Sequence, residues 1–204
     1  MIALRPELRI IAEWIEPGAR VLDLGCGDGA LLAHLMQSRE VSGYGLEIDP
    51  ANVLRCIENG VNVIEADIDA GLEEFGDQSF DYVVMSQALQ ALQHPDLAIR
   101  EILRVGQVGV LTFPNFGHWR ARTQLVRGRM PMTPALPSRW YSTENIHLCT
   151  VNDFEALCRE QAWSILRRNF TGPAQRQGWL SRSIPNLFAE SALYMLKGAI
   201  PAAA

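Results

Sequence analysis

The fold of this chain is decided by the stretch Val21-Leu22-Asp23-Leu24-Gly25-Cys26-Gly27-Asp28-Gly29. An apolar run leads into a turn with glycine at every second position, and apolar residues at helical spacing follow over residues 30–36. This order predicts a strand, a loop and a helix. Because glycine lacks a Cβ, Gly25 and Gly27 can adopt positive φ and let a ligand pack against the main chain. The stretch therefore predicts a binding site where the strand meets the helix.

Three carboxylates follow three successive predicted strands: Asp23, Glu47 and Asp67 each close an apolar run. In an open parallel sheet, ligands lie beyond the carboxyl ends of the strands, so these acids should face one crevice. We expect Glu47 to accept hydrogen bonds from both hydroxyls of a ribose and Asp67 from an adenine amino group. Asp23 would meet the ammonium group of the ligand, directly or through water. The alternative is that Asp23 and Asp67 only cap turns or helices.

The glycine spacing alone does not choose the cofactor, because Gly25, Gly27 and Ala30 also satisfy the looser dinucleotide pattern. The three acids favour a different ligand, since they would repel a pyrophosphate but suit a sulfonium with an amino-acid tail. S-adenosylmethionine or its demethylated product, S-adenosylhomocysteine, is therefore the expected cofactor. The residues expected to bind it are Asp23, Gly25, Cys26, Gly27, Glu47, Ile48, Asp67, Ile68 and Ser86.

Strands and helices alternate along the chain, which predicts βαβ units joined by right-handed crossovers. Strands are predicted at 20–24, 44–48, 62–65, 80–86, 108–113, 163–170 and 192–197. Helices are predicted at 8–15, 29–37, 50–57, 96–105 and 152–161. A turn-rich stretch from Gly172 separates the last two strands, which should pair antiparallel as in a hairpin. The expected fold class is α/β, a doubly wound, Rossmann-like, mostly parallel sheet with an antiparallel C-terminal strand.

Composition limits the remaining classes. The 204 residues, 48% of them hydrophobic, are enough for one domain with its own core, so we expect a single domain over 1–204. The formal net charge of −5 argues against a general nucleic-acid binder. The N-terminus lacks a signal-peptide pattern, and no apolar stretch approaches the ~20 residues of a membrane span. We therefore expect a cytoplasmic protein with neither a nucleic-acid nor a membrane partner.

The four cysteines show neither Cys-x-x-Cys spacing nor a compact disulfide framework, so free thiols are expected. His147, Cys149 and Cys158 lack the compact ligand pairs typical of zinc, so no metal is expected. Ser86 ends a predicted strand, but its neighbours do not form the Gly-x-Ser-x-Gly elbow of an α/β-hydrolase. A structural or cofactor-lining role is therefore expected for this serine.

The long connection over residues 114–150 is rich in proline, arginine and aromatic residues, and we call it the 114–150 segment. Long connections of this kind are often functional, and arginine with aromatic residues is typical of interface cores. One hypothesis makes the segment a lid that positions a substrate; another makes it a docking surface for a protein. A third places Trp119 and Trp140 in the core of the sheet. The substrate or partner candidates are Asn115, His118, Trp119, Arg129, Trp140, Tyr141 and His147.

The stretch 21–29, the acids Glu47 and Asp67, and the block Ser79-Phe80-Asp81-Tyr82-Val83-Val84 resemble class I S-adenosylmethionine-dependent methyltransferases. More specific segments resemble the methionine biosynthesis family MetW: 86–91 (SQALQA), 113–119 (FPNFGHW), 128–131 (GRMP), 140–141 (WY) and 145–150 (NIHLCT). The resemblance implies a seven-stranded methyltransferase-like fold and a role at the homoserine acylation step. It also implies association with a homoserine O-acyltransferase.

Two functions remain open. The chain is either a non-catalytic or activating subunit of that acyltransferase, or a free-standing methyltransferase for a small-molecule acceptor. No catalytic residue is assigned in either case, since methyl transfer from a sulfonium needs little more than in-line approach of the nucleophile.

Overall fold

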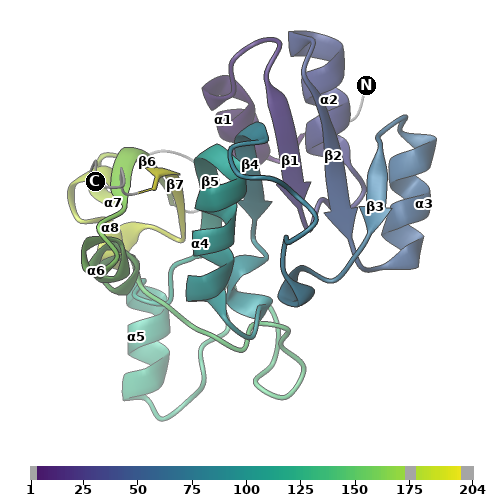
Figure 1. Ribbon diagram of the computed structural model, residues 1–204. Coiled ribbons are helices and arrows are strands. Elements are labelled where there is room, and N and C mark those ends of the chain that lie inside the picture. Colours follow the sequence, from purple (N-terminus) through teal and green to yellow (C-terminus); the bar gives the residue numbers. More distant parts are fainter. Residues whose placement is uncertain (1–3, 173–177, 199–204) are drawn as a thin grey trace.

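Seven strands form one sheet, in the order β3-β2-β1-β4-β5-β7-β6, in the computed structural model, which describes residues 4–172 and 178–198 (Figure 1). Strands β1 to β5 run parallel, and β7 pairs antiparallel with both β5 and β6. The predicted fold class is therefore confirmed. The strands are β1 (Arg20–Leu24), β2 (Ser42–Glu47), β3 (Val63–Glu65), β4 (Phe80–Ser86), β5 (Gly106–Pro114), β6 (Ser164–Thr171) and β7 (Ser191–Lys197).

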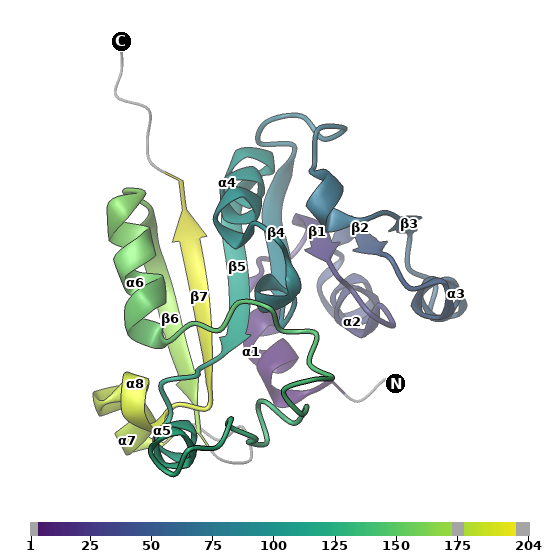
Figure 2. The ribbon, with the colours of Figure 1, turned by 90° about the horizontal axis from the view of Figure 1, so that it is seen from below.

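Helices cover both faces of the sheet, with α1 to α3 on one face and α4 and α6 on the other (Figure 2). They are α1 (Pro6–Trp14), α2 (Ala30–Arg39), α3 (Pro50–Glu58), α4 (Pro95–Val105), α5 (Trp119–Val126), α6 (Val151–Glu160), α7 (Trp179–Ser183) and α8 (Pro185–Phe188). Two short 3₁₀ turns, η1 (Ile68–Ala70) and η2 (Leu89–Ala91), complete the elements. No helix in the described ranges is long and apolar enough to span a membrane.

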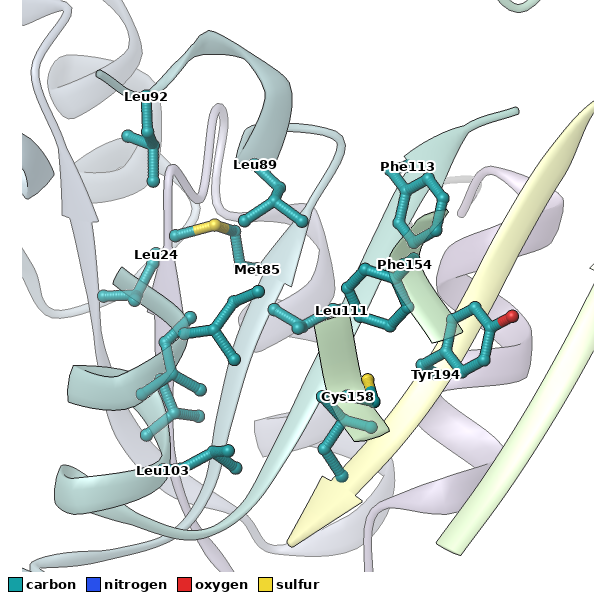
Figure 3. Close-up of a cluster of buried hydrophobic side chains, with 14 of the residues drawn as sticks. Leu24, Met85, Leu89, Leu92, Leu103, Leu111, Phe113, Phe154, Cys158 and Tyr194 are labelled. Carbon is teal, nitrogen blue, oxygen red and sulfur yellow. The ribbon is translucent and has the colours of Figure 1, made fainter. Parts of the chain in front are cut away.

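The core has two halves, one on each face of the sheet. In β4, Tyr82 and Val84 pack with α1 and α2, whereas Val83 and Met85 pack on the side of α4. Burial on both faces explains why this strand is a continuous apolar run. Figure 3 shows the half on the α4 and α6 side, where the Phe154 ring lies 4.7 Å from the ring of Phe113 and 4.7 Å from that of Tyr194.

Strand β2 lies close against β1. A Cβ on Gly43 would overlap the carbonyl oxygen of Val21 in the neighbouring strand, so only glycine fits there. At its other end, β2 contacts the loop that follows β1 through the carbonyl of Leu46 and the side chain of Glu47.

Three predicted features need correction. The 114–150 segment contains a helix, α5, which lacks an apolar period and was therefore not predicted. The antiparallel pairing of β6 and β7 is confirmed, but two short helices, α7 and α8, lie between them where a turn-rich stretch was expected. Part of that stretch, residues 173–177, lies outside the described residues. The strands predicted at 44–48 and 108–113 begin earlier than expected, at Ser42 and Gly106.

Candidate functional site

The loop between β1 and α2 presents its backbone to open space. Gly25 and Gly27 have φ of +65° and +58°, in the left-handed region that glycine favours. The N–H groups of Gly25 and Cys26 both donate to the carbonyl of Leu46, at 2.9 and 3.1 Å. A Cβ on Gly27 would meet no heavy atom of the described chain within 4 Å. The loop is thus held from one side and open on the other, where a ligand can touch the main chain.

Glu47 ties the loop to the end of β2. Its carboxylate is buried; Oε2 accepts from the N–H of Gly27 at 2.7 Å, and Oε1 accepts from Ile48 and Asp49 at 3.0 Å each. A carboxylate has about four acceptor sites, so about one remains. One ribose hydroxyl could bind without other changes. Binding both, as the sequence predicts, requires one backbone N–H to give up its bond.

Asp23 is buried at the end of β1. Burial raises the pKa of its carboxyl to about 7; the guanidinium of Arg5 opposes that increase, and Glu47 adds to it. Near neutral pH this carboxyl is therefore close to the midpoint between its neutral and charged forms. A cationic group placed against it would favour the charged form.

A cavity of about 60 Å³ lies over the loop, and five of the predicted cofactor residues line it: Asp23, Gly25, Cys26, Gly27 and Ser86. Arg5 and Leu8, which no local motif singled out, also line it. The Oγ atoms of Ser86 and Thr112 lie 3.2 Å apart, which fits the expected structural or lining role of the serine.

The other predicted cofactor residues lie at the same edge of the sheet. Ile68 Cδ1 would be 3.8 Å from a Cβ on Gly25, and Ile48 is exposed beside Glu47. Asp67 is exposed and caps η1, accepting from the N–H of Asp69 at 2.9 Å. This bond is the capping role weighed for Asp67 as an alternative, and it leaves the second carboxylate oxygen for other contacts.

A larger cavity, of about 470 Å³, lies between η1 and α4 and was not predicted. Its lining includes Leu24 and Ile68, and Leu97 and Arg104 of α4. It exists because the crossover from β3 to β4 contains only the short turn η1 in place of an α-helix.

All four cysteines are free, as expected, but two of them lie together. The Sγ atoms of Cys26 and Cys56 are 3.6 Å apart, and the thiol of Cys56 donates to the carbonyl of Gly27 at 3.1 Å. Burial raises the pKa of both thiols, so they stay protonated. The pair supports the loop from α3, a contact between distant residues that spacing along the chain does not show.

Two of the substrate or partner candidates are buried and hold the 114–150 segment in place. Asn115 is 2% exposed; its Nδ2 donates to the carbonyl of Ala189 at 2.8 Å, and its Oδ1 accepts from Gly117 and Val151 at 2.9 and 3.2 Å. His118 is also buried, and its Nδ1 accepts from the N–H of Arg120 at 3.3 Å, which caps α5. Burial lowers the pKa of His118. These contacts give both residues a structural role.

The other candidates are exposed. Trp119 is 42% and Trp140 72% exposed, so the hypothesis that they close the core is wrong. Tyr141 packs edge-on against Trp140, with ring centroids 5.5 Å apart. Arg129 and His147 are also exposed, and the Nε2 of His147 lies 3.1 Å from the carbonyl of Gln93. The segment therefore displays aromatic and basic groups to solvent.

The 114–150 segment is basic, whereas the rest of the chain is acidic. Residues 114–150 contain five arginines and one glutamate, a net charge of +4 in a chain of net charge −5. The remainder carries −9. In Figure 1 the segment lies beyond the arrowheads of β1 and β2, at the edge of the sheet that carries the glycine loop.

Solved structures with this fold include S-adenosylmethionine-dependent methyltransferases. One from Mesorhizobium loti has a TM-score of 0.67 at 17% identity, covering 94% of this chain and 95% of that one. Another, from Archaeoglobus fulgidus, has a TM-score of 0.62 at 16% identity, covering 95% and 92%. The [4+2]-cyclase SpnF has a TM-score of 0.67 at 19% identity, covering 95% and 81%. At these identities the likeness shows the fold alone.

One relative is similar enough in sequence to indicate the family. The bifunctional methionine biosynthesis protein MetXA/MetW of Rhodopirellula baltica is 33% identical over 202 residues, which cover 94% of this chain and 32% of the relative. This chain thus spans about a third of that protein's length. The sequence model of the family described as methionine biosynthesis protein MetW matches residues 5–196. The chain therefore belongs to the MetW family.

Proposed function

We propose that this chain acts in methionine biosynthesis together with a homoserine O-acyltransferase, and that it binds S-adenosylmethionine or S-adenosylhomocysteine at the glycine loop. The observation that carries the proposal is the open backbone at Gly27, framed by Glu47 and the buried Asp23, in a chain of the MetW family.

The residues at the loop fit this cofactor better than they fit a dinucleotide. Asp23 would hold the ammonium group, Glu47 the ribose, and Asp67 the adenine amino group, with Ile48 and Ile68 against the ring. When bound, S-adenosylmethionine would supply a sulfonium-linked methyl group, whereas S-adenosylhomocysteine would supply none.

The partner is inferred from the relative in which MetXA and MetW share one chain. Since this chain matches about a third of that protein, we infer that the acyltransferase lies in the remainder and that separate chains associate in the same way. Exposed aromatic residues beside arginines, as in the 114–150 segment, are typical of the anchors of protein interfaces. We therefore assign docking to this segment.

The first test measures homoserine acylation by the purified cognate acyltransferase, with and without a stoichiometric amount of this chain. A large increase in rate supports the partner role. No change in rate and no complex on gel filtration would contradict it, and would leave methyl transfer to a small-molecule acceptor as the competing function.

A second test is independent of the partner. Isothermal calorimetry with S-adenosylhomocysteine should give one site per chain. If no heat of binding is seen in a folded sample, the cofactor part of the proposal is wrong, whatever the acylation assay shows.

A further inference from the structure

A second polar cavity, of about 280 Å³, lies beside the loop site. Four parts of the chain line it: the start of α1, the end of β4, the 114–150 segment, and the start of β7. Arg5 lines both this cavity and the one over the loop, and the consecutive residues Ser86 and Gln87 line one each. The two cavities are therefore neighbours that share a wall.

Glu7 lines this cavity and carries a buried acceptor without a partner among the described residues. Its side chain is 3% exposed, and its Oε1 lies 3.6 Å from Nη1 of Arg5. Its Oε2 is buried and has no hydrogen-bond partner in the described part of the chain. Leaving a buried carboxylate oxygen without a donor is costly, so a donor in the cavity that draws the Glu7 carboxylate toward it would be favoured.

Glu190 supplies a second buried carboxylate to the lining. It is held rigidly, because its N–H donates to the carbonyl of Thr171 at 2.7 Å and its own carbonyl accepts from the N–H of Asn115 at 2.9 Å. Its Oε1 pairs with Nη1 of Arg120 at 3.3 Å. Burial raises the pKa of Glu190, which a cation in the cavity would reverse.

Arg5 and Gln87 supply further polar groups to the lining of this cavity. The side chain of Arg5 is 60% exposed and can turn its guanidinium toward the cavity to pair with a carboxylate. Gln87 adopts φ of +63°, and its N–H is held by the carbonyl and the Oγ1 of Thr112, both at 3.1 Å. Its amide offers the cavity both a donor and an acceptor.

We propose that this cavity binds a small α-amino acid in its zwitterionic form, with the ammonium group between Glu7 and Glu190 and the carboxylate on Arg5. The lining supplies two carboxylates for the ammonium group and one guanidinium for the carboxylate; Arg120, which pairs with Glu190, does not line the cavity. A dianion would be repelled, and a simple amine would leave Arg5 unused. A volume just below the usual range for drug-sized ligands suits a molecule of this size. This site shares only the wall residue Arg5 with the cavity over the loop, and it goes beyond the cofactor proposal.

The test measures binding of L-homoserine and L-methionine by calorimetry, with and without saturating S-adenosylhomocysteine. N-acetyl-L-methionine, which lacks the ammonium, and L-methionine methyl ester, which lacks the carboxylate, are the matched probes. The variant Glu7→Gln keeps the shape of the side chain and removes its charge. The control Glu13→Gln removes an exposed carboxylate from the same helix, α1.

We expect at least one of the two amino acids to bind, and both blocked probes to bind at least about tenfold more weakly. Glu7→Gln should lower the affinity for the amino acid by about tenfold or more. It should keep the wild-type affinity for S-adenosylhomocysteine and fold at least as stably as the wild type. Glu13→Gln should change none of these. If neither amino acid binds at about 10 mM, or if Glu7→Gln binds them as the wild type does, the proposal is wrong. If the wild type binds an amino acid but not S-adenosylhomocysteine, the proposed loop site is wrong and this cavity is supported.

Discussion

The glycine loop and the 114–150 segment lie at the same edge of the sheet but expose different groups for binding. In the loop, buried carboxylates and backbone N–H groups are arranged around an open main chain. In the segment, two buried polar residues fix the chain, and large side chains face the solvent. The loop is suited to a small ligand that touches backbone, and the segment to a protein. Breaking each region separately tests this division.

The largest effect is expected at Gly27. In Gly27→Val the new side chain enters the open space above the loop, so affinity for S-adenosylhomocysteine should fall by about 100-fold or more in calorimetry. Valine at positive φ also strains the backbone, by roughly 1–2 kcal/mol or more. The control Gly18→Val carries the same strain, since Gly18 has φ of +75° and open space around it, but it lies at the other end of β1.

The milder pair Gly27→Ala and Gly18→Ala covers the case in which the valine variants do not fold. Both should lower the free energy of unfolding by about 1–2 kcal/mol, because both impose a left-handed backbone on alanine. Only Gly27→Ala should lower the affinity for S-adenosylhomocysteine. Equal cofactor affinity in the two alanine variants would show that no ligand packs against Gly27.

The next largest effect is expected on stability, at Asn115. Removing its amide in Asn115→Ala leaves the N–H groups of Gly117 and Val151 and the carbonyl of Ala189 without partners. The free energy of unfolding should fall by about 3 kcal/mol, measured by urea denaturation. The control is Asn145→Ala, in the same segment, whose side chain makes no hydrogen bond to the described residues. A loss below about 0.5 kcal/mol would show that Asn115 is free for a binding role.

The difference between the regions also explains what the sequence could and could not predict. The loop, its glycines and the acid at the end of β2 were predicted because contiguous residues determine each of them. Helix α5 was not, because its sequence is polar around most of its surface and its start depends on the buried His118. The contact of Cys26 with Cys56, and the cavity that joins Glu7 to Glu190, need elements far apart in the chain to pack together.

A smaller effect is expected on partner binding. Trp140→Ala and Arg129→Glu should each weaken the complex with the cognate acyltransferase by roughly 2 kcal/mol, about 30-fold, because they remove an exposed aromatic anchor or reverse a charge. Cofactor affinity should stay unchanged. The matched controls are Tyr44→Ala and Arg55→Glu, exposed residues on β2 and α3. If all four variants co-elute with the partner at wild-type strength, docking uses another surface.

The smallest effect is expected on the pH dependence of cofactor binding at the loop. Burial raises the pKa of Asp23 to about 7, so below that pH the carboxyl is protonated before a ligand arrives. The ammonium group of the cofactor pairs only with the ionised form, and binding must then release a proton. Affinity for S-adenosylhomocysteine should therefore fall by up to about tenfold for each pH unit below 7 and stay level above it.

The raised pKa also affects folding with a definite sign. The unfolded carboxyl ionises near its model value of 3.8 and the folded one near 7, so folding takes up a proton between these values. The contribution of Asp23 to stability is greatest below the lower pKa and is lost as the pH rises to the higher one. Asp23→Asn should remove both dependences. If the wild type binds S-adenosylhomocysteine equally at about pH 5.5 and about pH 7.5, Asp23 does not meet the ammonium group. Cofactor recognition would then rest on Glu47 and the loop backbone.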